Sequence, residues 1–452
     1  MKIIVVGCGK IGSSIIGDLV SEGHDIVAVD EKADVAESMG NIYDVMSVCG
    51  NGADCETLSE AGAERADMLI ACTDSDEMNM LSCFIASKMG VGHTVARIRN
   101  PEYNDKNLTF LKSAIGLSLT LNPEMLAAKE LYNILKLPAA ANIETFNGNL
   151  EMIELNLKPD MPICGSTLME LRRKYNAKFL ICAVRRGETV HIPNGNFTLE
   201  SGDRIGLTAP PTEIQKLLKL MGVSRKQARS VMILGGSRTA YYLAKLLIAG
   251  GNTVRIIDRD EERCRQLAAE LPEAVLIHGD GAEQELLLEE GLESVDAFVA
   301  LTGMDEENIL ISIFAANKRV PKVVAKVNRP ELAAMARNLG LECLISPRKS
   351  VSDLTTSYVR ALENSAGSRI ETLYKLMDSG VEALEFLAAP DFPGLKTPLK
   401  ELQLKPNMII AGIARGRRAN IPTGDDVIEA GDRVIVIVAD QQLSDLSDIL
   451  QQ

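Results

Sequence analysis

The sequence is poor in residue types that mark particular classes of protein. It contains no tryptophan, and aromatic residues make up only 4% of its 452 residues. Any buried core must therefore be built from aliphatic side chains, and the 46% content of hydrophobic residues is ample for that purpose. Only four histidines occur, and none stands at the spacing of a metal-binding pair, so we predict no metal site.

Disulfide motifs and long apolar runs are also missing. The nine cysteines form no C-x-x-C pair, and their number is odd, which favours reduced thiols. No apolar run reaches the roughly 18 residues that a membrane-spanning helix needs. The first apolar run, KIIVV, is too short for a signal peptide. We therefore expect a cytoplasmic protein that reaches a membrane only through a partner.

The charge balance makes nucleic acid an unlikely partner class. The formal net charge is −14, which repels a phosphate backbone. No basic stripe interleaved with aromatic residues offsets this charge. The sequence thus predicts no nucleic-acid binding.

The feature that organises the chain is an internal repeat. Residues 1–223 correspond to residues 229–438, with matching positions 228 or 229 residues apart. A solenoid repeat spans only about 20–50 residues, so this is a tandem duplication of a larger module. Matching pairs include Gly7 and Gly235, Asp30 and Asp258, Thr73 and Thr302, Pro101 and Pro330, and Asp203 and Asp432.

Each copy predicts a doubly wound α/β domain followed by a small α+β domain. Short, uninterrupted apolar strands alternate with helical segments at the start of each copy, which indicates a parallel sheet covered on both faces. Short strands joined by turns such as Pro193-Asn194-Gly195 follow. We predict two Rossmann-like domains at residues 1–140 and 229–366, and two small domains at residues 141–224 and 369–452. The segment 210–229 is predicted to join the copies.

A glycine-rich loop opens the first copy. Gly7-Cys8-Gly9-Lys10-Ile11-Gly12 follows a strand and precedes a helix. The first glycine allows a tight turn, the second lets a pyrophosphate approach, and the third lets the helix pack against the sheet. The helix N-terminus then offers N–H groups to phosphates. Asp30 ends the second strand, where a carboxylate accepts ribose hydroxyls and favours NAD or an adenosine nucleotide over NADP.

The second glycine loop departs from this pattern. It reads Gly235-Gly236-Ser237-Arg238-Thr239-Ala240, so serine and alanine replace the second and third glycines. Alanine is tolerated at the third position, whereas a serine side chain crowds the approach of a pyrophosphate. Arg238 adds a positive charge and Asp258 is retained. The second site is therefore expected to bind nucleotide more weakly or to prefer a different one.

Further candidates lie at the carboxyl ends of the predicted strands, where a doubly wound sheet binds its ligand. They are Asn51, Thr73, Asp74 and Arg97 in the first copy and Asp280 and Thr302 in the second. Other interpretations stay open. The G-[N/D]-G segments could be turns only, Asp74 with Glu77 fits a helix capping box, and Arg97 could pair with a surface carboxylate.

Little in the sequence indicates catalysis. A dehydrogenase needs an acid or base beside the nicotinamide. Two Tyr-x-x-x-Lys segments occur, at Tyr132–Lys136 and Tyr241–Lys245, but neither is well placed for this role. We predict no catalytic residue. An NAD-dependent oxidoreductase and a structural scaffold with vestigial sites remain the alternatives to a binding protein.

The motifs resemble a known family. IIVVGCGKIG…VAVD, GNGADCETLSEAGAERADMLIACTDSDEMNM and ARIRNPEY resemble the RCK (or KTN) nucleotide-binding domain, and IPNGNFTLESGDRIGL resembles its C-terminal companion. Two such modules resemble the regulatory subunits of Trk-type potassium uptake systems. The resemblance implies a cytoplasmic homotetramer that binds NAD(H) and ATP or ADP and docks under an integral-membrane potassium channel subunit. It also implies that the residues singled out above form two nucleotide sites.

Overall fold

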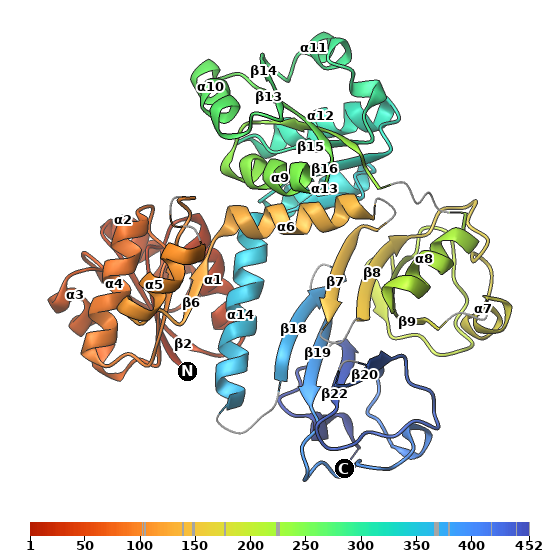
Figure 1. The fold of residues 1–452 in the computed structure, drawn as a ribbon. Coiled ribbons are helices and arrows are strands. Elements are labelled where there is room, and N and C mark those ends of the chain that lie inside the picture. Colours follow the sequence, from red (N-terminus) through yellow and green to blue (C-terminus); the bar gives the residue numbers. More distant parts are fainter. Residues whose placement is uncertain are drawn as a thin grey trace. The chain divides into compact units, whose positions relative to one another are not determined.

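The computed structural model describes most of the chain, in two compact units. The described residues are 1–101, 103, 105–137, 140–146, 150–175, 178–222, 227–365, 370–377, 380–416, 418–439 and 441–451. One unit comprises Met1–Lys129 with Ile345–Thr356, and the other comprises Glu130–Leu344 with Ser357–Gln452 (Figure 1). Within these described ranges, no helix has both the length and the apolar character needed to cross a membrane.

The first unit is built on a six-stranded parallel sheet. Its strand order is β3-β2-β1-β4-β5-β6, and all its neighbouring strands run parallel. The chain adds strands toward one edge of the sheet up to β3 and toward the other edge from β4. Such sheets bind ligands where this order reverses, between the carboxyl ends of β1 and β4. The strands are β1 (Lys2–Val6), β2 (Asp25–Asp30), β3 (Met46–Cys49), β4 (Met68–Ala71), β5 (His93–Arg97) and β6 (Leu119–Leu121).

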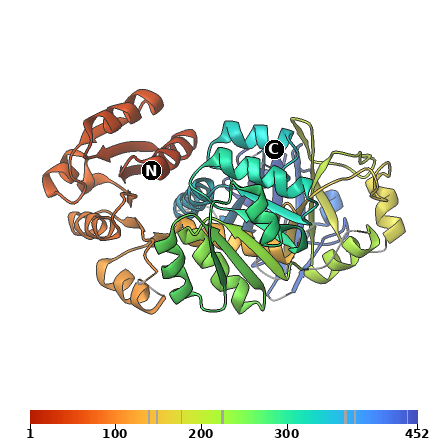
Figure 2. The same ribbon diagram turned by 90° about the horizontal axis from the view of Figure 1, so that it is seen from above.

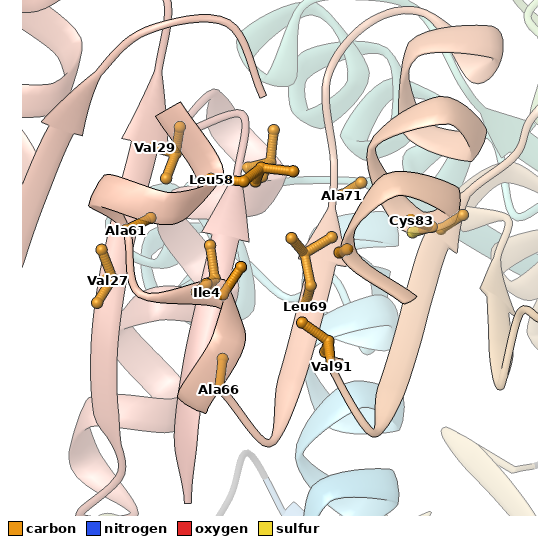
Figure 3. Packing of buried hydrophobic residues seen from close by; sticks show 14 of the residues in the cluster. Ile4, Val27, Val29, Leu58, Ala61, Ala66, Leu69, Ala71, Cys83 and Val91 are labelled. Atoms are coloured by element: carbon orange, nitrogen blue, oxygen red, sulfur yellow. The ribbon is translucent and has the colours of Figure 1, made fainter. Parts of the chain in front are cut away.

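Helices cover both faces of this sheet (Figures 1 and 2). Ile4, Val27 and Leu69 point from the strands into a core that Leu58 and Cys83 close from the helix side (Figure 3). The uninterrupted apolar strands of the sequence are explained by this double coverage. The helices of this sheet are α1 (Lys10–Ser21), α2 (Ala33–Tyr43), α3 (Cys55–Glu60), η1 (Ala63–Arg65), α4 (Asp76–Met89) and α5 (Asp105–Ile115). The helix α6 (Pro123–Lys136) follows and continues into the second unit.

The second unit contains a matching sheet, in the order β14-β13-β12-β15-β16-β17. Its strands are β12 (Ser230–Leu234), β13 (Thr253–Asp258), β14 (Val275–His278), β15 (Ala297–Ala300), β16 (Lys322–Lys326) and β17 (Cys343–Ile345). Its helices are α9 (Arg238–Ala249), α10 (Glu261–Glu270), α11 (Gln284–Glu289), η2 (Leu292–Ser294), α12 (Asp305–Asn317) and α13 (Pro330–Asn338), and α14 (Pro347–Ser365) follows. The predicted pair of Rossmann-like parallel sheets is confirmed.

Each Rossmann-like sheet is accompanied by a five-stranded antiparallel sheet. The orders are β10-β9-β11-β8-β7 and β18-β19-β22-β20-β21. The first contains β7 (Asn142–Phe146), β8 (Leu150–Asn156), β9 (Leu180–Arg186), β10 (Thr189–His191) and β11 (Arg204–Ala209), with α7 (Leu168–Tyr175) and α8 (Pro211–Leu220). The second contains β18 (Ile370–Leu376), β19 (Val381–Leu387), β20 (Met408–Arg415), β21 (Arg418–Asn420) and β22 (Arg433–Ala439), with η4 (Leu399–Glu401) and η5 (Leu446–Ile449).

The two antiparallel sheets share one hydrophobic core. Phe146 and Leu150 from the first sheet pack in the same cluster as Leu376 and Val381 from the second. The segment predicted to join the copies is more than a linker, because Leu217 of α8 is buried in the core of the first antiparallel domain. The fold class is thus confirmed, whereas the four domain boundaries stay a prediction.

An ion pair between a buried aspartate and a partly exposed arginine recurs at the same place in both antiparallel domains. Arg186 donates from Nε and Nη2 to the two carboxylate oxygens of Asp203, at 2.8 Å each. Arg415 binds Asp432 in the same way at 2.7 Å. Both aspartates are only 1% exposed. The repeated Gly-Asp-Arg segments of the sequence therefore provide one anchor of each small domain.

We expect replacement of Asp203 by asparagine to lower the free energy of unfolding by about 1.5–3 kcal/mol, the scale of hydrogen bonds to charged groups. Burial opposes ionisation of this carboxyl, but hydrogen bonds from Arg186 and the Glu200 amide outweigh it and lower its pKa. The stabilisation is present above the unfolded pKa, about 3.9, and is lost as the pH falls through the lower folded pKa. Denaturant unfolding between pH 7 and pH 3 measures it.

The control for this prediction is the exposed Asp160, replaced by asparagine in the same domain. Its stability should follow the wild-type pH dependence. Equal stability of the Asp203 variant and the wild type at pH 7 would contradict the prediction.

Candidate functional site

The first glycine loop (Gly7–Gly12) joins the carboxyl end of β1 to α1. Gly7 has φ of +86°, and a Cβ on it would stand 2.7 Å from the Thr73 amide nitrogen. A Cβ on Gly12 would stand 2.0 Å from the Gly7 carbonyl oxygen. These two glycines therefore have the turn and packing roles that their places in the loop predict.

Gly9 differs from the other two glycines because its surroundings leave room for a side chain. A Cβ on Gly9 would meet no atom within 4 Å. Gly9 is also the N-cap of the 12-residue helix α1, and no side chain caps this helix. No side chain therefore accepts a hydrogen bond from the first N–H groups of α1. An uncapped helix N-terminus of this kind is suited to bind a phosphate.

Asp30 is held against the first glycine loop. Its Oδ2 accepts a hydrogen bond from the Cys8 amide at 2.7 Å, and its Oδ1 accepts one from the Lys32 amide at 3.0 Å. Asp258 accepts from the Gly236 and Asp260 amides in the same way. The acid at the end of the second strand is therefore fixed beside the glycine loop in both copies. Its contact with a ribose stays a prediction.

Cys8, inside the first loop, supplies a backbone group rather than a reactive thiol. Its side chain is 3% exposed, and its Sγ faces the Val29 carbonyl oxygen. Burial, with the neighbouring Asp30 charge, raises the pKa of Cys8 to about 12. Burial also raises the pKa of Cys72 to about 12. Both thiols are therefore protonated at neutral pH, when they are poor nucleophiles.

The helix that follows the second glycine loop (Gly235–Ala240) has a side-chain cap, whereas the helix after the first loop has none. Ser237 is the N-cap of α9, and its hydroxyl accepts a hydrogen bond from the Ala240 amide at 3.3 Å. Arg263 donates from Nε to the Gly236 carbonyl oxygen at 2.6 Å. A phosphate at this helix would have to compete with the serine hydroxyl. Arg238 is exposed beside it, and Thr239 is buried.

Asn51 and Asp280 lie in equivalent exposed turns after the third strand of each sheet. Their Oδ1 atoms accept hydrogen bonds from the amides of Ala53 and Ala282, at 2.9 Å in both. A Cβ on Gly52 would stand 2.1 Å from Val6, so this turn packs directly on the first strand. The turn role of these segments is thus visible. A contact with adenosine stays a prediction.

Two buried asparagines that the sequence analysis missed organise the ends of the middle strands. Asn79 accepts hydrogen bonds from the amide and the hydroxyl of Thr73 and donates to the Arg97 carbonyl oxygen. Asn308 joins Thr302 and Lys326 identically. Both asparagines are fully buried. The signal was present in the sequence, because T-x-x-D-x-x-N occurs in both copies.

Arg97 and Asp74 face each other at the rim of this region. Arg97 Nη1 lies 3.7 Å from Asp74 Oδ1, and the Asp74 side chain is fully exposed. Burial lowers the pKa of Arg97. The capping-box interpretation of Asp74 with Glu77 is wrong, because α4 begins at Asp76 and its N-cap is Ser75. The surface-carboxylate interpretation of Arg97 agrees with this pairing, and its partner is itself a candidate site residue.

The two Tyr-x-x-x-Lys segments are occupied by contacts within their own helices. Lys245 Nζ donates to the Tyr241 hydroxyl at 3.3 Å, and Lys136 Nζ lies 4.2 Å from the centre of the Tyr132 ring. No group of three or more potential metal ligands occurs within the described ranges. The candidate site in each copy is thus the glycine loop with the acid fixed beside it.

Solved structures share this arrangement of domains. The GsuK channel bound to NAD is similar over 97% of this chain and 77% of its own, with a TM-score of 0.63 and 19% identity. GsuK bound to ADP is similar over 80% of this chain and 69% of its own, with a TM-score of 0.52 and 15% identity. At these identities the likeness shows the fold alone.

Sequence comparisons are more specific. The TrkA-N domain matches residues 3–114 and 231–347, and the TrkA-C domain matches residues 152–222 and 385–451. The Trk system potassium uptake protein TrkA homolog of Archaeoglobus fulgidus is 29% identical over the full length of both chains. Trk system potassium uptake protein TrkA of Vibrio alginolyticus is 30% identical over 100% of this chain and 99% of its own. This chain therefore belongs to the TrkA family of Trk system potassium uptake proteins.

Proposed function

We propose that this protein is a nucleotide-sensing regulatory subunit that gates an integral-membrane potassium channel subunit of the Trk type. One observation carries the proposal: in a chain of the TrkA family, no side chain caps α1, the space around the Gly9 Cβ position is open, and Asp30 is hydrogen-bonded to the same loop. That constellation suits the phosphates and ribose of one nucleotide. We further propose that the subunit works as a cytoplasmic homotetramer docked to the channel.

NAD(H) and ATP or ADP are the proposed ligands. The GsuK structures with NAD and ADP support this choice, because they share the fold of this chain. In the first site, the backbone of Gly7–Ile11 would hold the phosphates and Asp30 the ribose, with Asn51, Thr73, Asp74 and Arg97 around them. In the second site, residues 235–239, Asp258, Asp280 and Thr302 have the corresponding places.

Gating requires that a ligand bind two conformations of the homotetramer with different affinity. A nucleotide that bound both conformations equally would shift no equilibrium, however tight its binding. Two linked copies with unequal sites suit this requirement, because occupancy of one site can favour one conformation. The oxidoreductase alternative has less support, since the candidate tyrosines are engaged within their helices.

Equilibrium binding of NAD, NADH, ATP and ADP to the full chain tests the first half of the proposal. Potassium flux through the Trk-type channel subunit in proteoliposomes, with each nucleotide added, tests the second half. Binding without any effect on flux would refute gating. Absence of any binding would favour the scaffold alternative. Turnover of NADH, followed by its absorbance at about 340 nm, would favour the oxidoreductase.

We expect replacement of Asp30 by alanine to weaken nucleotide binding at the first site by about 1.5–3 kcal/mol, the scale of hydrogen bonds to a charged group. The ribose would lose the carboxylate that accepts its hydroxyl groups, and the Cys8 amide would lose its hydrogen-bond acceptor. Titration calorimetry measures the change. The exposed Asp34, replaced by alanine, is the control because it removes the same charge from the adjoining helix. Unchanged affinity in the Asp30 variant would refute its place in the site.

A further inference from the structure

The two glycine loops differ by a coupled exchange. Where the first loop has Cys8, the second has Gly236, and where α2 has Val35, α10 has Arg263. A Cβ on Gly236 would stand 3.3 Å from Arg263 Cγ and 2.8 Å from a Leu267 methyl group. The missing side chain therefore makes room for the arginine. The second copy has exchanged an inert thiol for a cation at its glycine loop.

Hydrogen bonds hold the Arg263 guanidinium in place but leave some of its N–H donors available. Its Nε donates to the Gly236 carbonyl oxygen at 2.6 Å, and its Nη1 donates to Gln266 Oε1 at 3.4 Å. Its Nη2 forms no hydrogen bond to the residues that the structure describes. The side chain is half-buried beside the loop. An arginine held in this way presents N–H donors in fixed geometry, which suits a phosphate.

Two neighbouring exchanges add positive charge or remove negative charge at the second site. Arg259 follows Asp258, whereas Glu31 follows Asp30. Gly303 stands at the position of Asp74, so the carboxylate that faces Arg97 in the first site has no counterpart.

Three exchanges act in the opposite direction. Asp280 stands at the position of Asn51, and Glu307, which accepts a hydrogen bond from the Thr302 hydroxyl, stands at the position of Met78. Asp260 stands at the position of Lys32, but its carboxylate is engaged as the N-cap of α10. These exchanges of charge largely cancel, so Arg263 itself is the feature that distinguishes the second loop from the first.

We propose that the second site takes a nucleotide with a singly substituted phosphate group, one that has three free oxygens, and that Arg263 binds this group, whereas the first copy has Val35 at this position. This inference rests on the proposed nucleotide-sensing function and names the ligand class of its second site. A singly substituted phosphate group carries about 1.5–2 negative charges at neutral pH and three acceptor oxygens, which the guanidinium can bind in bidentate fashion. The terminal phosphate of ADP or ATP has these properties. The ribose 2′-phosphate of NADP has them too, but the fixed Asp258 carboxylate opposes its binding.

Binding to the full-length chain tests this inference. Gly9→Leu, which blocks the first site, provides the background so that only the second site is titrated. ADP, NADP and NAD are titrated calorimetrically into Gly9→Leu alone and into Gly9→Leu combined with Arg263→Met, Arg263→Lys or Arg265→Met. Arg265 is the matched control, because it lies on the same helix and pairs with Glu261 at the surface. Arg263→Lys keeps the charge and removes the planar fork.

We expect Arg263→Met to weaken the binding of ADP, of NADP or of both by roughly tenfold to hundredfold, as the loss of a charge-assisted hydrogen bond implies. NAD, which has no singly substituted phosphate, should bind the second site more weakly than ADP or NADP and lose little further affinity in Arg263→Met. Arg265→Met should bind as the background does, and Arg263→Lys should be intermediate. A response of ADP alone identifies the terminal phosphate, and a response of NADP alone identifies the 2′-phosphate.

Two results would overturn the inference. One is equal affinity of the Arg263→Met and Arg265→Met proteins for ADP and equal affinity for NADP. The other is the absence of nucleotide binding to the Gly9→Leu protein while the wild type still binds, which would leave the proposed function in place. Absence of binding to the wild type itself would instead remove the proposed function.

Discussion

Replacing Gly9 by leucine is expected to abolish nucleotide binding at the first site while the protein remains folded. The backbone of Gly9 is extended, with φ of −64° and ψ of −168°, so a larger residue is not strained there. A Cβ at this position points into open space. The leucine side chain would extend from there over the uncapped N-terminus of α1, where the phosphates are proposed to bind. Loss of these contacts should weaken binding at least roughly hundredfold.

Titration calorimetry and thermal unfolding of the same preparation separate the two parts of this prediction. The melting temperature should stay near that of the wild type, because Gly-to-Leu at an N-cap costs less than about 1 kcal/mol. Replacement of Gly23 by leucine is not a matched control, since Gly23 has φ of +83°. Ser14→Leu is more suitable, because it places the same side chain on the half-buried surface of α1 away from the loop. Wild-type nucleotide affinity in Gly9→Leu would refute the first site.

Replacing Gly12 by alanine is expected to destabilise the first unit by about 3 kcal/mol. The added methyl would stand 2.0 Å from the Gly7 carbonyl oxygen, which is a backbone atom and cannot rotate away. Either α1 or the glycine loop must move, and overpacking of this kind costs roughly 1–3 kcal/mol, sometimes more. Thermal unfolding should show the transition of this unit lowered by roughly 5–10 °C.

The second copy provides the control for this substitution. Ala240 stands at the position of Gly12, and its methyl group is accommodated there. The reciprocal change, Ala240→Gly, should cost only about 0.5–1 kcal/mol, the effect of a glycine in a helix. If Gly12→Ala and Ala240→Gly lowered stability equally, the close approach at Gly12 would not be the cause.

The Rossmann-like sheets could be predicted because their signals are local. Uninterrupted strands such as Ile3–Val6 are buried on both faces, and the glycine loop directly follows the first of them. The strand β7 and the core role of α8 were not predicted. Leu217 belongs to a polar-looking segment, and only its packing against the antiparallel sheet distinguishes that helix from a linker.

In the candidate sites, too, the residues with local roles could be predicted and those with tertiary contacts could not. Gly7, Gly12 and Asp30 could be assigned from the sequence, since each has a role that depends on neighbours a few residues away or on the adjoining strand. Asn79 was missed because its partners, Thr73 and Arg97, meet it only when two parallel strands end side by side. The capping residue of α4 was also misplaced by one position, since Ser75 and not Asp74 precedes the first helical turn.

The sequence by itself determined the duplication, the fold class and the family, because periodicity, glycine spacing and similarity are properties of the order of residues. It also showed that the two glycine loops are unequal. Only the tertiary structure decided how they differ: Gly9 leaves a helix N-terminus open, whereas Ser237 caps its counterpart and Arg263 reaches the second loop from another helix. That contact joins residues from separate elements, so it exists only once the sheet has brought their ends together.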